Sequence, residues 1–118
     1  VYTIGSDWQT TAYDHTNWTA TNVEDIVAAA TVEGHSPWNE GVCRGPDNEL
    51  TVVGRDSQND DGYVIRSTDG GTTWSEITED IIAVYGGALG PMTRCMYNDT
   101  HLMLGGPGIY AYAEISAL

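Results

Sequence analysis

The sequence predicts an all-β fold made of repeated antiparallel sheets, and two observations predict it. The chain resembles itself at an offset of about fifty residues, a period typical of propellers and solenoids. Near its middle, an alternating strand runs into a glycine-rich turn, which is the pattern of a tight β-hairpin. Together they indicate an array of similar sheets, each built from hairpins.

The repeat is visible in three strand starts, each a short β-rich run closed by glycine. These runs are residues 2–5, 51–54 and 102–105, at offsets of 49 and 51 residues. Residues 24–28 also resemble residues 79–83, and each segment follows a tryptophan, Trp18 or Trp74. Short helical turns are expected to begin near Asn22 and Thr78, before glycine- and proline-bearing segments that cross from one sheet to the next.

A tight hairpin is predicted for residues 67–74, because their residue types suit the separate requirements of a turn. Residues 63–66 form the incoming strand, and Gly70 and Gly71 supply the positive φ values that reverse the chain. Asp69 can accept hydrogen bonds from the turn amides, with the hydroxyls of Ser67 and Thr72 satisfying others. Trp74 on the return strand is expected to bury its ring beneath the turn.

This segment resembles the Asp-box, written S/T-x-D-x-G-x-T-W/F, at Ser67, Asp69, Gly71, Thr73 and Trp74. In the families that carry it, the box marks the turn between the two outer strands of a β-propeller blade, far from any active site. The resemblance therefore implies antiparallel, four-stranded propeller blades with Asp-box hairpins. Residues 14–18 look like an eroded box that keeps the acid and the tryptophan.

The blades are expected to form a single β-propeller module over residues 1–118. Residues 1–33 would form a partial blade, residues 41–85 a full blade and residues 92–118 another partial blade. Because a blade takes roughly 40 to 50 residues, this chain cannot close a ring alone. Either the ring closes by oligomerisation or sequence is missing, and both alternatives stay open.

The two cysteines lack the clustered spacing of a metal site, so they form either a disulfide or two buried thiols. The repeat places residues 42–44 and 93–95 on the innermost strands of successive blades. Cys43 and Cys95 are then near-equivalent positions, which repetition explains without any bond. We therefore expect two buried, reduced thiols.

The charge balance excludes some classes of partner. The chain has 17 acidic residues against 4 arginines, no lysine, and a formal net charge of -13. Such a surface repels nucleic acid and anionic lipid, so we expect neither nucleic-acid binding nor membrane insertion. Solubility and adaptation to high salt are two explanations of this charge that the sequence does not separate.

The setting is expected to be extracellular, at a cell surface or on a virion. No apolar run approaches the length of a membrane span, and the first residue is Val1, which indicates a processed or fragmentary chain. Residues 17–19 and 98–100 are glycosylation sequons, which are consistent with this setting.

Two arginines suggest an enzyme as the alternative. Arg44-Gly45-Pro46 is similar to the arginine-x-proline of sialidases, which are Asp-box propellers, and Arg55 lies before Asp56, Asp60 and Asp61. The resemblance would make Arg44 and Arg55 carboxylate clamps and one aspartate a general acid. However, Gly45 replaces a hydrophobic residue of that motif, and neither a third arginine nor a tyrosine activated by glutamate can be assigned. We favour a structural role, with Arg44 and its repeat counterpart Arg94 lining the centre of the ring.

Other candidate sites are less specific. Trp8 and Trp38 lie in polar, loop-like segments and are candidates for stacking on a glycan, with packing between blades as the alternative. The three histidines lack ligand spacing, so we expect no zinc site and no cofactor. Weak calcium binding at Asp56, Asn59 and Asp61 is a minor alternative, because the segment lacks the glutamate that closes a calcium loop.

These observations favour a non-catalytic structural or recognition module. It would self-assemble, as a homo-oligomer or within a larger assembly, or present loops to a glycan or protein partner. The alternative is a fragment of a sialidase-like glycoside hydrolase.

Overall fold

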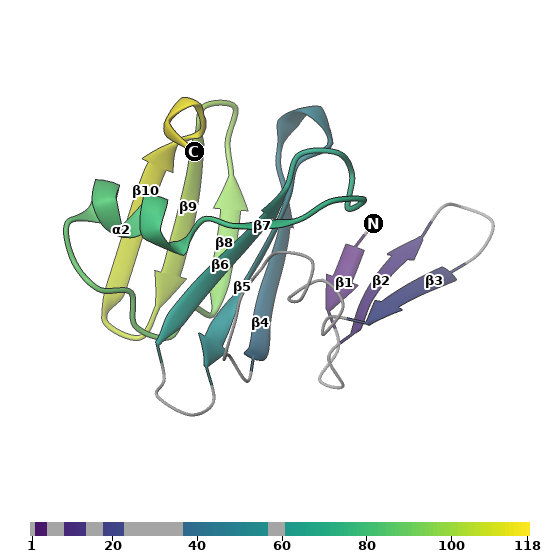
Figure 1. The fold of residues 1–118 in the computed structure, drawn as a ribbon, viewed down its shortest axis with the longest axis horizontal. Helices are drawn as coiled ribbons and strands as arrows, with labels where there is room; N and C mark the ends of the chain where they lie inside the picture. Colours follow the sequence, from purple (N-terminus) through teal and green to yellow (C-terminus); the bar gives the residue numbers. More distant parts are fainter. Residues whose placement is uncertain (1, 5–8, 14–17, 23–36, 57–60) are drawn as a thin grey trace.

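The computed structural model describes the backbone of residues 2–4, 9–13, 18–22, 37–56 and 61–118, and their side chains from Glu40 onward. Most of this chain is antiparallel β-sheet, arranged as three sheets that follow one another in the sequence (Figure 1). Within each sheet, neighbouring strands are also neighbours along the chain. The predicted all-β class is therefore confirmed, while the described residues form no closed ring.

The first sheet has three strands: β1 (Tyr2–Ile4), β2 (Gln9–Tyr13) and β3 (Trp18–Asn22). The second has four: β4 (Pro37–Arg44), β5 (Leu50–Asp56), β6 (Gly62–Ser67) and β7 (Ser75–Glu76). The third again has three: β8 (Arg94–Tyr97), β9 (His101–Gly106) and β10 (Ile109–Glu114). Three short helices complete the described elements: η1 (Pro46–Asn48), α2 (Thr78–Tyr85) and η2 (Ile115–Ala117).

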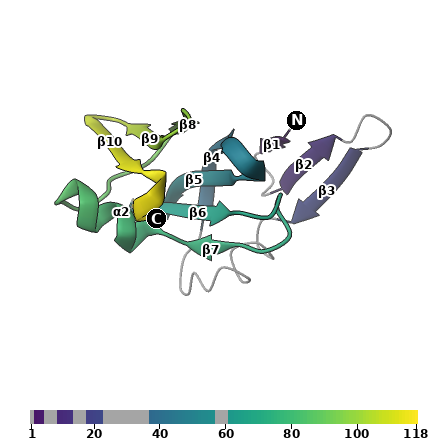
Figure 2. The same cartoon turned by 90° about the horizontal axis from the view of Figure 1, so that it is seen from above.

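The second and third sheets pack on one another. Their first strands, β4 and β8, lie side by side and run in the same direction (Figure 1), and the sheets diverge from there toward α2 (Figure 2). The space between them holds the hydrophobic core: Val53, Val64, Ile77, Ile81, Leu89, Met92, Leu102, Leu104, Ala111 and Ala113.

Strand alternation gives the third sheet two unlike faces. We call the side toward the second sheet its near face, formed by Cys95, Tyr97, Leu102, Leu104, Ile109, Ala111 and Ala113. We call the opposite side its far face, formed by Arg94, Met96, His101, Met103, Gly105, Tyr110, Tyr112 and Glu114. Leu102, Leu104, Ala111 and Ala113 of the near face are almost fully buried.

The helix predicted near Thr78 is confirmed, because α2 begins at that residue. The Thr78 hydroxyl accepts a hydrogen bond from the Val64 amide (3.0 Å) and donates one to the Glu76 carboxylate (2.8 Å), which fixes the helix start to β6. The helix ends at Tyr85 and is capped by Gly86, whose φ of 83° is the left-handed conformation that glycine adopts most easily. Asn22 ends β3, and the helical turn expected after it lies outside the described residues.

The segment between α2 and β8 crosses from the outer part of the second sheet to the third, as the sequence predicted. Its backbone bonds both sheets: Leu89 accepts from the Gly62 amide (3.0 Å), and Thr93 donates to the Gly105 carbonyl (2.9 Å). Met92, between them, is fully buried. The crossing segment therefore locks the two sheets together along the edge of the core.

One expectation about β4 is wrong. Trp38 was assigned to a loop and the second sheet to residues from about 41, yet β4 begins at Pro37 and pairs Trp38 with Arg55. A register irregularity between Asn39 and Gly41 lets the strand extend past its glycine.

The helices α2, η1 and η2 are all too short to span a membrane, and the described residues contain no other helix.

Candidate functional site

The Ser67–Trp74 hairpin joins β6 to β7 and is held by the carboxylate of Asp69. Its Oδ1 accepts hydrogen bonds from the amides of Thr72 (3.0 Å) and Thr73 (2.8 Å) and from the Ser67 hydroxyl (2.8 Å). Its Oδ2 accepts from the Thr73 hydroxyl (2.6 Å). The Thr72 hydroxyl, which was expected to accept from a turn amide, instead donates to the Asp69 backbone carbonyl at 3.4 Å.

The glycines of this hairpin adopt the backbone conformation that the sequence required. Gly70 has a φ of 75° and Gly71 a φ of 95°. Trp74, which was expected to bury its ring beneath the turn, is half-buried, and its indole N–H donates to the Gly71 carbonyl at 3.0 Å. The Gly70 amide also donates to the Asn48 carbonyl (3.1 Å), which ties the hairpin to the η1 loop.

Hydrogen bonding gives Asp69 an unusual acidity although it is exposed. Donation from the Thr73 hydroxyl, then from the Thr73 amide and the Ser67 hydroxyl, lowers the pKa of Asp69 from 3.8 to about 2. The charged carboxylate is thus the form that organises the turn, as expected for a structural element.

The two arginines proposed as a carboxylate clamp lie far apart. Arg44 pairs with Leu50 at one end of the β4–β5 hairpin, and Arg55 pairs with Trp38 at the other. Six residues of extended strand separate Trp38 from Arg44, or roughly 20 Å. The two arginines also lie on opposite faces of the sheet. Arg44 pairs with Leu50 on one face, whereas Arg55 lies on the other face with Val53.

Each of these arginines has a local polar neighbour. Arg44 is exposed and donates to the Asn48 side chain at 3.1 Å. The Nε of Arg55 lies 3.7 Å from the Glu40 carboxylate, and both side chains are about one third exposed or less. The structure therefore does not bring Arg44 and Arg55 into one pocket.

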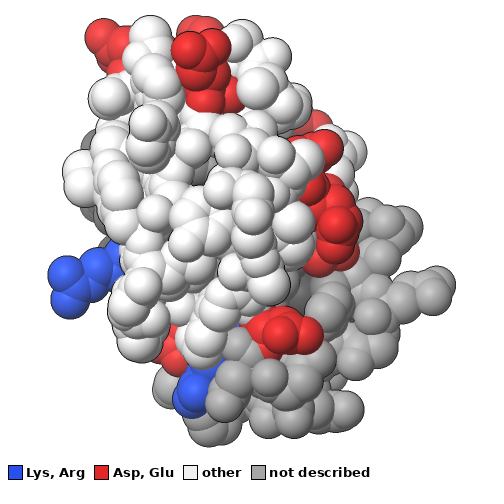
Figure 3. Space-filling view, turned by 90° about the vertical axis from the view of Figure 1, so that its left-hand side faces the viewer, with Lys and Arg blue, Asp and Glu red and all other residues white. Residues whose placement is uncertain are grey.

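The far face of the third sheet is the most exposed apolar surface among the described side chains. Met96 is 60% exposed, Tyr110 62% and Tyr112 58%. Figure 3 shows the adjoining side of the molecule, where β10 and α2 lie, and that side is largely free of charge, with acidic and basic groups toward its margins. Large apolar side chains gathered on one sheet face mark an interaction surface.

A groove runs across this far face. It has a volume of about 260 Å³, and its lining includes Arg94, Met96, Met103, Gly105 and Tyr110. Gly105 forms part of its floor, since no atom lies within 4 Å of the place where a Cβ would stand. Beside it, Met103, Tyr110 and Tyr112 line a second hollow of about 240 Å³ together with Asn98 and His101.

The far face was not identified from the sequence. The available signal was the alternation of tyrosine and alanine over residues 110–113, which puts the small residues on one side of β10 and the large ones on the other. That pattern alone favours burial of the tyrosines. Only the packing of helix α2 and the core against the alanines shows that the tyrosines are the exposed set.

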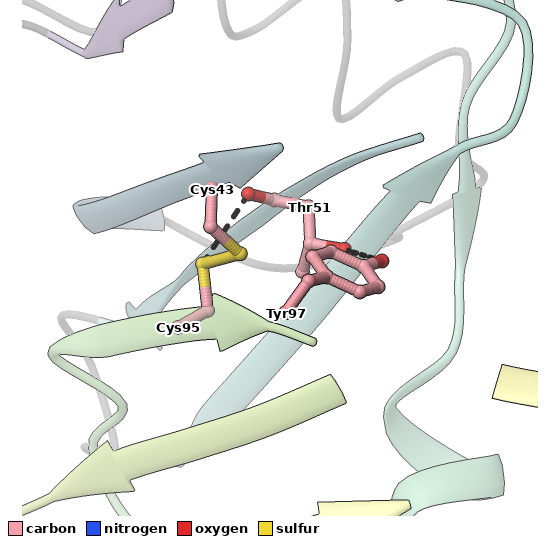
Figure 4. The surroundings of a disulfide bond; sticks show 4 residues. All are labelled: Cys43, Thr51, Cys95 and Tyr97. Carbon is pink, nitrogen blue, oxygen red and sulfur yellow. Dashed lines mark hydrogen bonds between the residues drawn. A yellow bond between two sulfur atoms is a disulfide. The ribbon is translucent and has the colours of Figure 1, made fainter. Parts of the chain in front are cut away.

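The prediction of two reduced thiols is wrong, because Cys43 and Cys95 form a disulfide between β4 and β8 (Figure 4). Their Cα atoms are 5.7 Å apart, within the range that such a bond requires. The Cys95 sulfur also lies 3.5 Å from the Thr51 carbonyl oxygen, a contact rather than a hydrogen bond because a bonded sulfur carries no proton.

The error came from assuming that the cysteines occupy equivalent positions. Val52 pairs with Val42, ten residues earlier, whereas Leu104 pairs with Cys95, nine residues earlier. A change of one residue turns a side chain to the other face of a strand. Cys95 therefore faces the second sheet, and Cys43 faces the third.

The faces on which β5 and β9 bury their side chains also correct the offset between the two repeats. Leu50 and Val52 are buried on the side of the second sheet that faces away from the third, and Leu102 and Leu104 are buried on the corresponding side of the third. These pairs are 52 residues apart, not 51. At 51, Val53 would be matched to Leu104, which lies on the opposite face of its sheet.

Sequence reasoning also missed a buried polar cluster between the two sheets. Arg66 donates to the Glu49 carboxylate at 2.5 Å, and both side chains are about one tenth exposed. Tyr97 and the Thr51 hydroxyl share a hydrogen bond of 2.5 Å beside them, and burial raises the pKa of Tyr97. An arginine in the otherwise apolar strand 63–66 was the only available signal.

The remaining predicted site residues are placed only in part. Trp8 and Asn59 lie outside the described residues, as does the side chain of Trp38. Asp56 is buried at the end of β5, and Asp61 is exposed just before β6. In the part of the chain that is described, no three histidine, cysteine or acidic side chains gather closely enough to hold a metal ion.

The sequon asparagine Asn98 is exposed between β8 and β9. Its side-chain oxygen accepts hydrogen bonds from the amides of Thr100 (2.8 Å) and His101 (2.7 Å), which closes the turn. The nitrogen that a glycan would modify is not used in these bonds.

Comparisons with protein-family models, with curated proteins and with solved structures find no match to this chain. The fold and its surfaces therefore carry the functional argument.

Proposed function

We propose that this chain is a non-catalytic structural or recognition module of the Asp-box propeller type, which acts through its surfaces outside the cell or on a virion. The observation that carries the proposal is the far face of the third sheet. There Met96, Tyr110 and Tyr112 are each more than half exposed around an apolar groove. A surface of this kind is costly to leave in water unless it binds a partner.

The hairpin and the stacked sheets support the propeller part of the proposal. The Asp69 carboxylate accepts hydrogen bonds from turn amides and from the Ser67 hydroxyl, which supports an Asp-box role for this segment. The first strands β4 and β8 run side by side in the same direction, as successive blades would require (Figure 1).

The disulfide supports the proposed location. Bonds such as Cys43–Cys95 persist in oxidising compartments and are reduced in most cytosols. An acidic surface and an exposed sequon asparagine are consistent with the same setting.

The separation of Arg44 from Arg55 weighs against the sialidase-like alternative. A bidentate clamp needs both guanidinium groups within reach of one small carboxylate. Here they stand at opposite ends and on opposite faces of a hairpin.

One experiment separates the two functions. The mass of the chain in solution is measured by light scattering, and the same sample is assayed against a panel of glycosides that includes sialosides. We expect an oligomer, or a chain that binds a glycan array, with no hydrolysis above buffer. A compact monomer that cleaves sialosides would overturn the proposal.

A further inference from the structure

The two packed sheets show how this chain covers a sheet face. On the second sheet, Thr51, Val53, Val64 and Arg66 lie on the side toward the third sheet, where all four are buried. The near face of the third sheet and helix α2 cover them, and the Cys43–Cys95 disulfide fastens the two sheets together.

The far face of the third sheet repeats that covered surface. Val52 and Leu104 are equivalent, because both are buried residues of a central strand and lie 52 positions apart. At this offset, Thr51 corresponds to Met103 and Val53 to Gly105. Val64 pairs with Val53 and Tyr110 pairs with Gly105, so Val64 corresponds to Tyr110. In the same way, Arg66 pairs with Thr51 and Tyr112 with Met103, so Arg66 corresponds to Tyr112. Of these counterparts of buried residues, Tyr110 and Tyr112 are exposed, and Met103 and Gly105 are partly exposed.

We propose that the far face of the third sheet is covered by the first sheet, β1–β3, of a second copy of this chain. The inference rests on the proposed function and names its partner. The contact would be head-to-tail, since the third and first sheets lie at opposite ends of the array (Figure 1). It continues the sheet-on-sheet packing already present between the second and third sheets.

The chemistry of the face favours a sheet over a sugar. The rings of Tyr110 and Tyr112 are tilted by 38° with their centres 6.2 Å apart, so they do not form one flat platform for a pyranose. Methionines and tyrosines beside an apolar groove are typical of protein contacts. The floor at Gly105 leaves room for a partner side chain.

Charge also favours a second copy. Arg94 lines the groove, is exposed, and makes no ion pair within the described part of the chain. A partner that is itself strongly acidic suits an uncompensated arginine at the contact, and this chain carries 17 acidic residues against 4 arginines.

The test measures self-association of the 118-residue chain by sedimentation over a range of concentrations. The double variant Tyr110→Ser/Tyr112→Ser should raise the dissociation constant roughly tenfold or more, because large aromatic side chains dominate such contacts. The matched control is Tyr85→Ser, which removes an exposed tyrosine from α2 and should leave association unchanged. Circular dichroism and thiol titration establish that each variant is folded and oxidised.

A second measurement identifies the partner surface. A photo-crosslinking residue, p-benzoylphenylalanine, replaces Tyr110, and mass spectrometry locates the bond formed in the oligomer. A crosslink from one copy to residues 2–22 of another is expected. A bond between two copies of Tyr110 would overturn the head-to-tail arrangement.

The outcomes also separate this inference from the proposed function. A wild-type chain that stays monomeric at high concentration overturns the inference, as does equal weakening by the Tyr85 control. If that monomer binds a glycan array without hydrolysis, the proposed function stands while its assigned partner is wrong. If it hydrolyses glycosides, both are wrong.

Discussion

The two faces of the third sheet differ in a way that its composition does not suggest. On β10, the near face presents Ala111 and Ala113, which are buried, and the far face presents Tyr110 and Tyr112, which are more than half exposed. The smaller residues are inside because helix α2 and the core residues between the sheets pack against that side of β10. The larger ones point outward, where an exposed face normally carries polar groups. The near face thus accounts for stability, and the far face is the exposed surface for which we propose a partner.

The largest expected effect is on stability, and it comes from removing the disulfide that joins the near face to the second sheet. Cys43→Ser/Cys95→Ser should lower the free energy of unfolding by about 4 kcal/mol, because the bond closes a long loop in the unfolded chain. Urea denaturation at a concentration where the chain is monomeric measures the change. Met96→Ser, on the neighbouring residue of the opposite face, should have little effect. Equal losses in the two variants would show that the faces do not differ.

A second pair of variants compares adjacent residues of β9. Leu104→Ala opens a cavity in the core between the sheets and should cost about 3 kcal/mol. Met103→Ala removes a side chain of similar size from the far face and should cost well under half of that in the monomer. Both are measured by urea denaturation, and a larger cost for Met103→Ala would contradict the assignment of faces.

The glycines at the end of β9 offer a sharper comparison. At Gly106, a Cβ would overlap the Pro91 carbonyl oxygen of the crossing segment, whereas at Gly105 it would meet no atom within 4 Å. We expect Gly106→Ala to cost about 2 kcal/mol through forced displacement of packed backbone. Gly105→Ala should be nearly neutral for folding and should weaken self-association instead. Thermal unfolding and sedimentation of the two variants check this.

The smallest expected effect concerns the Ser67–Trp74 hairpin, which lies apart from both faces. The pKa of Asp69 is about 2 when folded, below its ordinary value of 3.8. Because the folded pKa is depressed, the stabilisation is present above about pH 4 and is lost as the pH falls toward 2. Asp69→Asn should lower the melting temperature at pH 6 and flatten its dependence between pH 4 and pH 2. Asp99→Asn, an exposed acid elsewhere, is the control and should leave this dependence in place.

Local features were predictable because the residues that cause them are adjacent. Gly70 and Gly71 follow Asp69 within one turn, so their positive φ values and the bonds of the Asp69 carboxylate can be inferred from eight consecutive residues. The start of α2 at Thr78 was predictable for the same reason. The bonds of the Thr72 and Thr73 hydroxyls to the Asp69 backbone carbonyl and carboxylate were not predictable, because they depend on the final torsion angles of the turn.

Features that depend on strand parity were not predictable. The disulfide required Cys43 and Cys95 to face one another, and a difference of one residue in the pairing of β8 and β9 decided that. The Glu49–Arg66 pair joins residues that are 17 positions apart, and its burial depends on the third sheet covering it. Repeat alignment does not reveal which side of a strand is covered.

The sequence by itself therefore determined the all-β class, the order of the hairpins and the chemistry of the Ser67–Trp74 turn, because short-range hydrogen bonding and backbone preference are written in neighbouring residues. Only the tertiary structure decided which faces are buried, which arginine is enclosed and that the cysteines are bonded. The physical reason is that a strand offers two sides of similar composition, and the packing of a distant sheet selects between them.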